Sequence, residues 1–226
     1  MEYVDIIARF ESLADPKATD GMARYGIVGS KVYGIKIPVL KKLAKEAGKR
    51  NHELALKLWS HGSREARILA AMIDDHRQVT VEQLDRWVRD FDNWEVCDQC
   101  IMCLFDKTPF AWDKAFEWSA REEEFVKRAG FAMMARLAWS DKKADDKKIE
   151  SFLPVLKREA NDRRNFVKKA VNWALRQIGK RSAYLNARAL ETAREILAMD
   201  TPSSRWIAND AIRELESEAV RKRLGL

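Results

Sequence analysis

Five ten-residue segments decide the fold of this chain, because they repeat one apolar pattern along the sequence. They are REARILAAMI (64–73), EVCDQCIMCL (95–104), KRAGFAMMAR (127–136), KKAVNWALRQ (168–177) and WIANDAIREL (206–215). Aligned without gaps, their third positions all hold a small residue: Ala66, Cys97, Ala129, Ala170 and Ala208. Four residues later, the position is apolar in each segment: Ala70, Ile101, Met133, Ala174 and Ile212. An apolar step of four residues is typical of a helix that buries one face.

The distances between these small residues indicate a repeat architecture. Successive anchors are 31, 32, 41 and 38 residues apart, which is the length of a helical hairpin. Such hairpins bury their apolar faces by stacking on their neighbours. We therefore predict an all-α protein, an α-solenoid of HEAT-like helical hairpin repeats with a concave basic groove. The expected organisation is a single domain over 1–226, with repeats over about 51–215 and an N-terminal helical cap over 1–50. An ordinary helical bundle is the alternative.

The remaining sequence also predicts helices. Apolar periodicity places them at about 3–14, 38–47, 51–60, 63–74, 80–91, 94–106, 109–119, 123–139, 146–159, 163–179, 183–198 and 203–223. Pro154 is expected to kink or split the helix in which it falls. First helical turns are expected at Pro38, Pro109 and Pro202, with N-caps at Thr80, Thr108 and Thr201.

The composition is that of a folded, basic protein. Hydrophobic residues make up 46% and charged residues 34%, with a net charge of +7 and a pI near 9.3. This excess of cations favours a polyanionic partner such as nucleic acid. No apolar run reaches the length needed to cross a bilayer, so we expect no membrane association. The start MEYVDIIARF lacks a signal-peptide pattern, and the expected location is the cytoplasm.

Positive charge recurs near equivalent positions of the repeated segments. The residues concerned include Lys127, Arg128, Arg136, Lys168, Lys169 and Arg176. On stacked helices they would form a basic stripe, where helix N-termini add partial positive charge. We expect this stripe to contact phosphate groups without reading a base sequence. The ordinary alternative is a solvated charged face.

Asp98 departs from this basic pattern. It lies in the stretch DNWEVCDQC (92–100), four residues after Trp94, so both belong to one helix face. Trp173 stands where the other segments hold Leu, Cys or Ala. Two indoles and a carboxylate suit a cation. Alternatively, both tryptophans belong to the core and Asp98 pairs with an arginine.

The three cysteines, Cys97, Cys100 and Cys103, resemble a metal motif but lack a fourth ligand. Steps of three residues also follow one side of a helix, where thiols pack like small apolar groups. We therefore predict buried packing residues, with no metal and no cofactor.

Three stretches together carry a resemblance to a known family. DNWEVCDQC, VKRAGFAMMARLAW and FVKKAVNWALRQIGK resemble the AlkD-type DNA alkylation repair family of HEAT-repeat DNA glycosylases. YGIKIPVLKKLAK looks like the family's N-terminal signature, so the likeness extends from about residue 25 to 215. By position, the family's catalytic groups fall on Trp94, Asp98 and Trp173. Its phosphate-contacting residues fall on Arg128, Arg136 and Arg176.

The resemblance implies a monofunctional alkylpurine DNA glycosylase of base excision repair. Such an enzyme excises cationic N-alkylated purines, such as 3-methyladenine and 7-methylguanine, from duplex DNA, here without base flipping. Asp98 would stabilise an oxocarbenium-like sugar. The expected partner is double-stranded DNA containing alkylated bases, and the expected state is a monomer. The alternatives are a catalytically inactive module that binds damaged or branched DNA, and a protein–protein scaffold.

Overall fold

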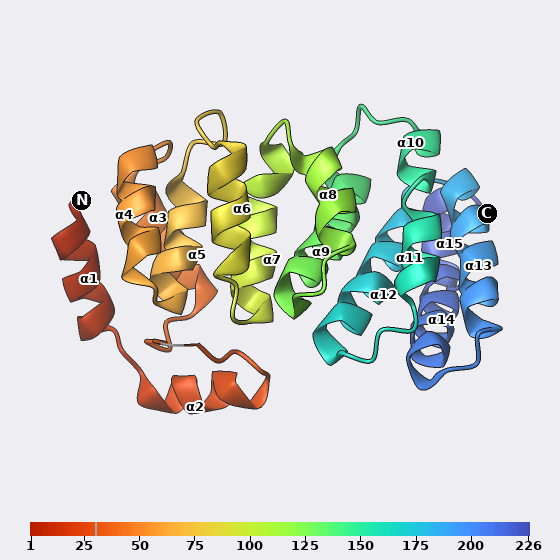
Figure 1. The fold of residues 1–226 in the computed structure, drawn as a ribbon, viewed down its shortest axis with the longest axis horizontal. Helices are drawn as coiled ribbons and strands as arrows, with labels where there is room; N and C mark the ends of the chain where they lie inside the picture. The colour runs from red at the N-terminus through yellow and green to blue at the C-terminus, as the bar shows by residue number, and fades with distance from the viewer. Residues whose placement is uncertain (30) are drawn as a thin grey trace. The chain divides into compact units, whose positions relative to one another are not determined.

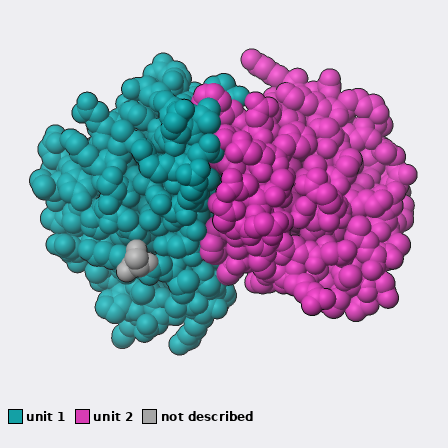
Figure 2. All heavy atoms as spheres, viewed as in Figure 1, with its two compact units in different colours: residues 1–109 teal, residues 110–226 magenta. Residues whose placement is uncertain are grey.

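The computed structural model describes residues 1–29 and 31–226. In this part of the chain, the regular secondary structure is helical and no strand occurs, which confirms the all-α prediction (Figure 1). The chain divides into two compact units, Met1–Pro109 and Phe110–Leu226, coloured separately in Figure 2. We call them unit 1 and unit 2 and describe each by itself. The predicted extents of the N-terminal cap and of the repeats stay predictions.

Unit 1 contains two layers of helices. Its elements are α1 (Tyr3–Ser12), α2 (Pro16–Arg24), α3 (Ile37–Ala47), α4 (His52–His61), α5 (Arg64–Ile73), α6 (Val81–Arg89), α7 (Trp94–Cys103) and the short 3-10 helix η1 (Phe105–Lys107). Helix α5 contacts α3 on one side and α7 on the other, which makes these three a layer (Figure 1). Helix α4 packs on α5 from the second layer. Trp59 of α4 stacks on Trp87 of α6, with ring centroids 3.9 Å apart.

Unit 2 repeats the same arrangement. Its elements are α8 (Ala111–Ser119), α9 (Glu124–Ser140), α10 (Asp146–Glu150), α11 (Leu153–Glu159), α12 (Asn165–Gly179), α13 (Ala183–Leu197), α14 (Pro202–Leu215) and α15 (Glu218–Leu224). Helix α12 contacts both α9 and α14, while α8, α11 and α13 pack on this layer from outside (Figure 1). Helices α8 and α9 approach very closely, because a Cβ at Gly130 would lie 2.3 Å from the Ser119 backbone nitrogen.

The repeated segments occupy equivalent places in the two units. In unit 1 they fall on α5 and α7, within the layer that also contains α3. In unit 2 they fall on α9, α12 and α14, which form the corresponding layer of that unit. The five small anchor residues, Ala66, Cys97, Ala129, Ala170 and Ala208, are all 0% exposed. These positions therefore allow neighbouring helices to stack, as the sequence predicts. Of the apolar positions four residues later, Ile212 is partly exposed and the rest are buried.

Several helix boundaries differ from the prediction. Helix α2 was not predicted: none of its residues is fully buried, and the Asp15 side chain caps its first turn. The prediction of a helix start at Thr108 and Pro109 is wrong, since Phe110 is the N-cap of α8 and Thr108 instead ends η1. Pro154 does mark a break, at the first turn of α11.

Other start signals agree with the structure. Thr80 and Thr201 accept hydrogen bonds from the backbone as N-caps of α6 and α14. The predicted helix over 203–223 is two helices, because Ser217 caps α15 through the Val220 N–H. No helix in the described ranges is long and apolar enough to span a membrane.

Candidate nucleic-acid interface

Trp94 and Asp98 lie one turn apart on α7, and a buried asparagine fixes where this helix begins. Asn93, 0% exposed, accepts hydrogen bonds from the backbone N–H groups of Glu95, at 3.1 Å, and Val96, at 3.0 Å. An asparagine N-cap of this kind satisfies donors that the first helical turn cannot pair. Trp94 is therefore the first helical residue, and Asp98 falls on the same face, as the four-residue spacing predicts.

The Asp98 carboxylate is shielded from most of the solvent. The residue is 9% exposed, whereas Trp94 before it and Met102 after it on the same helix face are both partly exposed. A carboxylate at this depth attracts a nearby positive charge more strongly than one in bulk water does. The face of α7 that carries Asp98 can therefore stabilise a cation that reaches it.

The N-terminal segment of unit 1 supports this face through two backbone carbonyls. The Trp94 indole N–H donates to the Tyr25 carbonyl at 2.9 Å, and the Asn93 amide donates to the Val28 carbonyl at 3.0 Å. Sequence reasoning missed both contacts, because a backbone carbonyl has no residue-type signal. The available hint was the pair Gly26 and Gly29 in the stretch YGIVG.

A buried ionic network ties the next part of that segment to α5 and α7. The Glu65 carboxylate accepts the backbone N–H groups of Tyr33, Gly34 and Ile35 at 3.0–3.2 Å. Arg64 pairs with both Glu65, at 2.7 Å, and Glu95 on α7, at 2.5 Å. Because Glu65 is fully buried, loss of any of these partners would leave an uncompensated charge in the interior, which is strongly destabilising. The network therefore fixes α7 relative to the N-terminal segment whose Tyr25 carbonyl accepts the Trp94 hydrogen bond.

In unit 2, Trp173 and Arg176 lie about one turn apart on α12, and both are partly exposed. The Arg176 guanidinium forms ion pairs with Glu214 and, at 3.6 Å, with Asp210, both on α14. Burial raises the pKa of Glu214, but hydrogen bonds from Lys180 and Arg176 outweigh it, so that its pKa is lowered overall. Arg176 is thus held at the surface by carboxylates with which a phosphate would compete.

Lys127 and Arg128 link α9 to the segment around the start of α12. The Lys127 ammonium lies 2.9 Å from Glu159 and 3.9 Å from Asp162, and its residue is 5% exposed. Arg128, 6% exposed, donates to the Phe166 carbonyl at 2.7 Å. Both residues therefore have structural partners, and their predicted contact with phosphate stays a prediction.

The remaining basic residues of the predicted stripe lie nearer the solvent. The Arg136 guanidinium lies over the Trp139 ring, 4.7 Å from its centroid, and Trp139 is 56% exposed. The Lys168 ammonium lies 4.9 Å from the centroid of Trp206. Lys169 is exposed. These cations and rings are accessible to a polyanion.

Of the three cysteines of α7, Cys97 and Cys100 are buried packing residues, as predicted. The prediction of a buried Cys103 is wrong, because this residue is partly exposed near the C-terminal end of the helix. Burial raises the pKa of the Cys100 thiol well above its ordinary value. Among the residues that the structure describes, no three His, Cys, Asp or Glu side chains are grouped so as to hold a metal ion.

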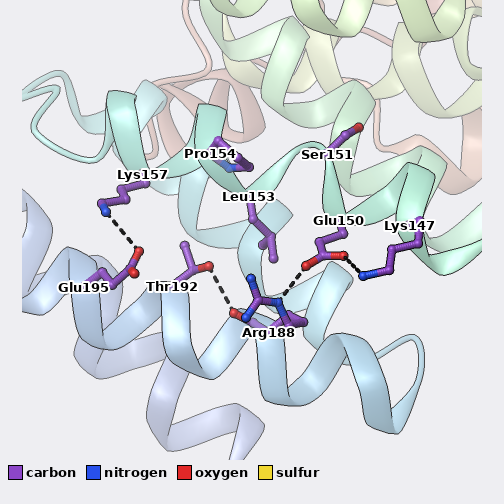
Figure 3. A pocket seen from close by; sticks show the side chains of 9 residues that line it. All are labelled: Lys147, Glu150, Ser151, Leu153, Pro154, Lys157, Arg188, Thr192 and Glu195. Carbon is purple, nitrogen blue, oxygen red and sulfur yellow. Dashed lines mark hydrogen bonds and ion pairs between the residues drawn. The ribbon is translucent and has the colours of Figure 1, made fainter.

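A cavity of about 400 Å³ in unit 2 lies beside α10, α11 and α13, and its charges are internally paired (Figure 3). Glu150 pairs with Lys147, at 3.1 Å, and with Arg188, at 2.6 Å, while Lys157 pairs with Glu195 at 3.0 Å. Hydrogen bonds from Tyr184, Arg188 and Lys147 lower the pKa of Glu150 to about 2. Such a neutralised cavity has little attraction for an anion.

Comparison with known proteins agrees with this architecture. One solved structure is described as "A new family of proteins related to the HEAT-like repeat DNA glycosylases with affinity for branched DNA structures". It aligns over 100% of this chain and 97% of its own, with a TM-score of 0.83 and 22% sequence identity, which confirms the HEAT-like repeat fold. No curated protein sequence is significantly similar to this chain. The family profile described as "DNA alkylation repair enzyme" matches residues 6–215. With a match over nearly its whole length, the chain belongs to the DNA alkylation repair enzyme family.

Proposed function

We propose that this protein is a DNA glycosylase that removes positively charged N-alkylated purines, such as 3-methyladenine and 7-methylguanine, from duplex DNA. The observation that carries the proposal is the placement of Asp98. It is a nine-tenths buried carboxylate on the same helix face as Trp94, in a basic chain of the DNA alkylation repair enzyme family. The proposed setting is base excision repair in the cytoplasm, with the protein acting as a monomer.

The proposed chemistry needs a fixed negative charge and little else. Alkylation of a ring nitrogen makes the purine a cation, so it leaves as a neutral base when the N-glycosidic bond breaks and takes the bonding electrons. No acid has to protonate the leaving group. The deoxyribose then carries the positive charge as an oxocarbenium-like species, which an ordered carboxylate stabilises. Water adds to C1′ and releases a proton to solvent. Asp98 is assigned to the sugar cation, and it can also orient the water.

Trp94 is assigned to the lesion nucleotide, because it is partly exposed one turn from Asp98 on the same helix face and an indole face attracts cations. Trp173 is assigned to the same role on the family resemblance of the stretch around it. Binding through sugar and backbone removes the need to swing the base into a deep pocket, as most glycosylases do. A β-lyase step would need an amine nucleophile, and none is assigned here, so we propose a monofunctional enzyme without a cofactor.

DNA affinity is assigned to the basic side chains of unit 2. Arg136, Lys168 and Lys169 are accessible in the structure. Arg176 would exchange its carboxylate partners for phosphate, and Arg128 and Lys127 support α9 next to them. Contacts of this type are independent of base sequence and weaken as salt is added.

A direct assay tests the proposal. Duplex DNA treated with a methylating agent is incubated with the protein, and the released bases are separated and identified. The proposal predicts release of 3-methyladenine and 7-methylguanine and no strand cleavage by the protein itself. Absence of base release at protein concentrations that saturate the DNA would contradict it.

A second candidate function is DNA binding without base release. It is favoured by the solved structure of similar fold, which is described as having affinity for branched DNA. Under this alternative, the protein binds DNA junctions more tightly than plain duplex and releases no base. Affinity for DNA junctions and release of methylated bases are measured on the same protein preparation, so the two results distinguish the two candidate functions.

A further inference from the structure

A cavity of about 280 Å³ in unit 1 is lined by lysines and by no carboxylate of the described residues, whereas the cavity in Figure 3 is lined by both cations and carboxylates. We call it the lysine trough. Lys41, Lys45, Lys49 and Lys107 line it, together with the apolar side chains of Met72 and Met102. No acidic residue of the described chain lines it. The trough therefore combines a surplus of cations with apolar surface.

Three of these lysines form a row along α3. Lys41 and Lys45 are four residues apart on its exposed side, and Lys49 follows just beyond the helix end. Four residues of helix rise about 6 Å, so the row presents regularly spaced positive charges. A linear polyanion matches such a row better than a compact anion does.

The position of Lys49 is built by an unusual turn. Gly48 has φ +86°, and Arg50 has φ +63°, a left-handed conformation that residues other than glycine rarely adopt. The Asn51 N–H donates to the Ile73 carbonyl at 2.9 Å, which ties this turn to the end of α5. Lys49 is thereby held beside Met72.

The ammonium groups of the row lack carboxylate partners. Within residues 1–29 and 31–226, Lys41, Lys45 and Lys49 form no ion pair, whereas Lys147, Lys157 and Arg188 of the unit 2 cavity are all paired (Figure 3). Lys107 donates to the Cys103 carbonyl, which orients its charge. An arriving anion would not have to displace a protein carboxylate.

The trough continues the face of α7 that carries Asp98. Met102 lies four residues beyond Asp98, just as Asp98 lies four beyond Trp94, so the three side chains share one line of the helix. Both Met102 and Met72 are partly exposed. Flexible thioether side chains adapt to planar rings and make favourable contacts with them.

We propose that the lysine trough binds unpaired nucleotides of a DNA strand that continues from the duplex held at Asp98. The lysine row takes the phosphates, and Met72 and Met102 take the exposed bases. A fully paired duplex keeps its bases stacked inside and so presents none of them to the two methionines. An acidic protein segment also matches the charge, but nothing about it would explain the continuity with Asp98. The inference rests on the proposed binding of DNA at that face.

The test compares two DNA ligands. Affinity is measured by fluorescence anisotropy, over a series of salt concentrations, for a blunt duplex and for the same duplex with a short single-stranded overhang. Wild type should bind the overhang form more tightly. Lys45→Ala combined with Lys49→Ala should abolish this preference. For the DNA with the overhang, the double variant should also reduce the slope of log affinity against log salt by roughly 1.4, because each of the two lost single-strand phosphate contacts accounts for about 0.7.

Matched controls keep the outcome specific. Lys42→Ala removes an exposed lysine of the same helix that does not line the trough, and it should retain the preference. Met102→Ser should weaken the preference without changing the salt slope. Circular dichroism melts verify that each variant is folded, and release of methylated bases from blunt duplex should be unchanged in the double lysine variant.

The outcomes separate this inference from the proposed function. Equal affinity of wild type for both DNAs, or an unchanged preference in the double variant, overturns the trough assignment. Either result would leave the glycosylase proposal standing if base release persists. Binding of an acidic amphipathic peptide that the double variant loses, without any overhang preference, would make the trough a protein-docking site and also overturn the inference. Failure to bind any DNA would instead overturn the proposed function.

Discussion

The indole N–H of Trp94 donates a hydrogen bond to the backbone carbonyl of Tyr25 at 2.9 Å, across a sequence separation of 69 residues. Tyr25 itself is largely exposed to solvent, with 76% of its surface accessible. The N-terminal segment therefore supports the candidate site through its backbone, and the orientation of the Trp94 ring depends on it.

Replacement of Trp94 by phenylalanine keeps an aromatic ring but removes this hydrogen bond. The free energy of unfolding should fall by about 1 kcal/mol, the net value of a typical hydrogen bond. The rate of base release should fall further, on the order of tenfold to a hundredfold, because small displacements of positioning groups are costly. Urea unfolding and single-turnover base release measure the two effects. Trp139→Phe, at an exposed tryptophan, is the control, and equal behaviour of the two variants would refute the positioning role.

The buried carboxylate of Glu65 should be essential for the stability of unit 1. Glu65→Gln keeps the shape but weakens three backbone hydrogen bonds and removes a charge partner of buried Arg64. Breaking a buried ion pair from one side costs about 3 kcal/mol. The exposed Glu53→Gln should cost far less. Denaturant unfolding of the two variants decides the matter, and comparable losses would show that the network contributes little.

The close approach of α8 and α9 should make Gly130 intolerant of any side chain. A Cβ there would lie 2.3 Å from the Ser119 backbone nitrogen, so Gly130→Ala must push the two helices apart. Overpacking of this kind costs about 1–3 kcal/mol. Gly21→Ala, where nothing lies within 4 Å, should instead stabilise the chain by about 0.5 kcal/mol. Thermal melts of both variants should move in opposite directions, and a shared direction would contradict this packing.

The ion pairs of Glu214 should make stability depend on pH in the acidic range. Its folded pKa is lowered, so its contribution is present above the unfolded value and is lost as pH falls through the folded value. The difference in stability between wild type and Glu214→Gln should therefore be largest near neutral pH and vanish in acid. A difference that grows in acid would have the wrong sign.

The same variant should strengthen DNA binding if Arg176 contacts phosphate. Glu214→Gln removes the carboxylate that competes for the Arg176 guanidinium, whereas Arg176→Ala removes the cation itself. Affinity for duplex DNA should rise in the first variant and fall in the second. Weakened binding in both would argue against a phosphate contact at Arg176.

The stacking helices were predictable from the sequence because each one buries a small residue and has an apolar residue four positions later. This spacing is visible in the sequence. Ala66, Ala129 and Ala208 are buried as expected, since a helix that loses its small contact residue cannot approach its neighbour. Helix α2 was not predicted because it has no fully buried residue to mark a core-facing side; Asp15 caps its first turn. Local signals at Thr108 and Pro109 failed because Phe105 to Lys107 form a short extra turn there.

The candidate site was predictable only where side chains carry the signal. The spacing of Trp94 and Asp98 was enough to place them on one helix face. The carbonyls of Tyr25 and Val28 could not be anticipated, since every residue has one. The carboxylates that engage Lys127 come from another helix and from the segment after it, and such partners appear only once the chain is folded.

Asp98→Asn is the most direct test of the central claim, that this carboxylate stabilises the sugar cation during base release. The amide has nearly the same size but no charge, so duplex affinity measured by anisotropy should stay near that of wild type. Single-turnover release of 7-methylguanine from methylated duplex should be reduced to the background rate. Base release at the wild-type rate by folded Asp98→Asn protein would contradict the account.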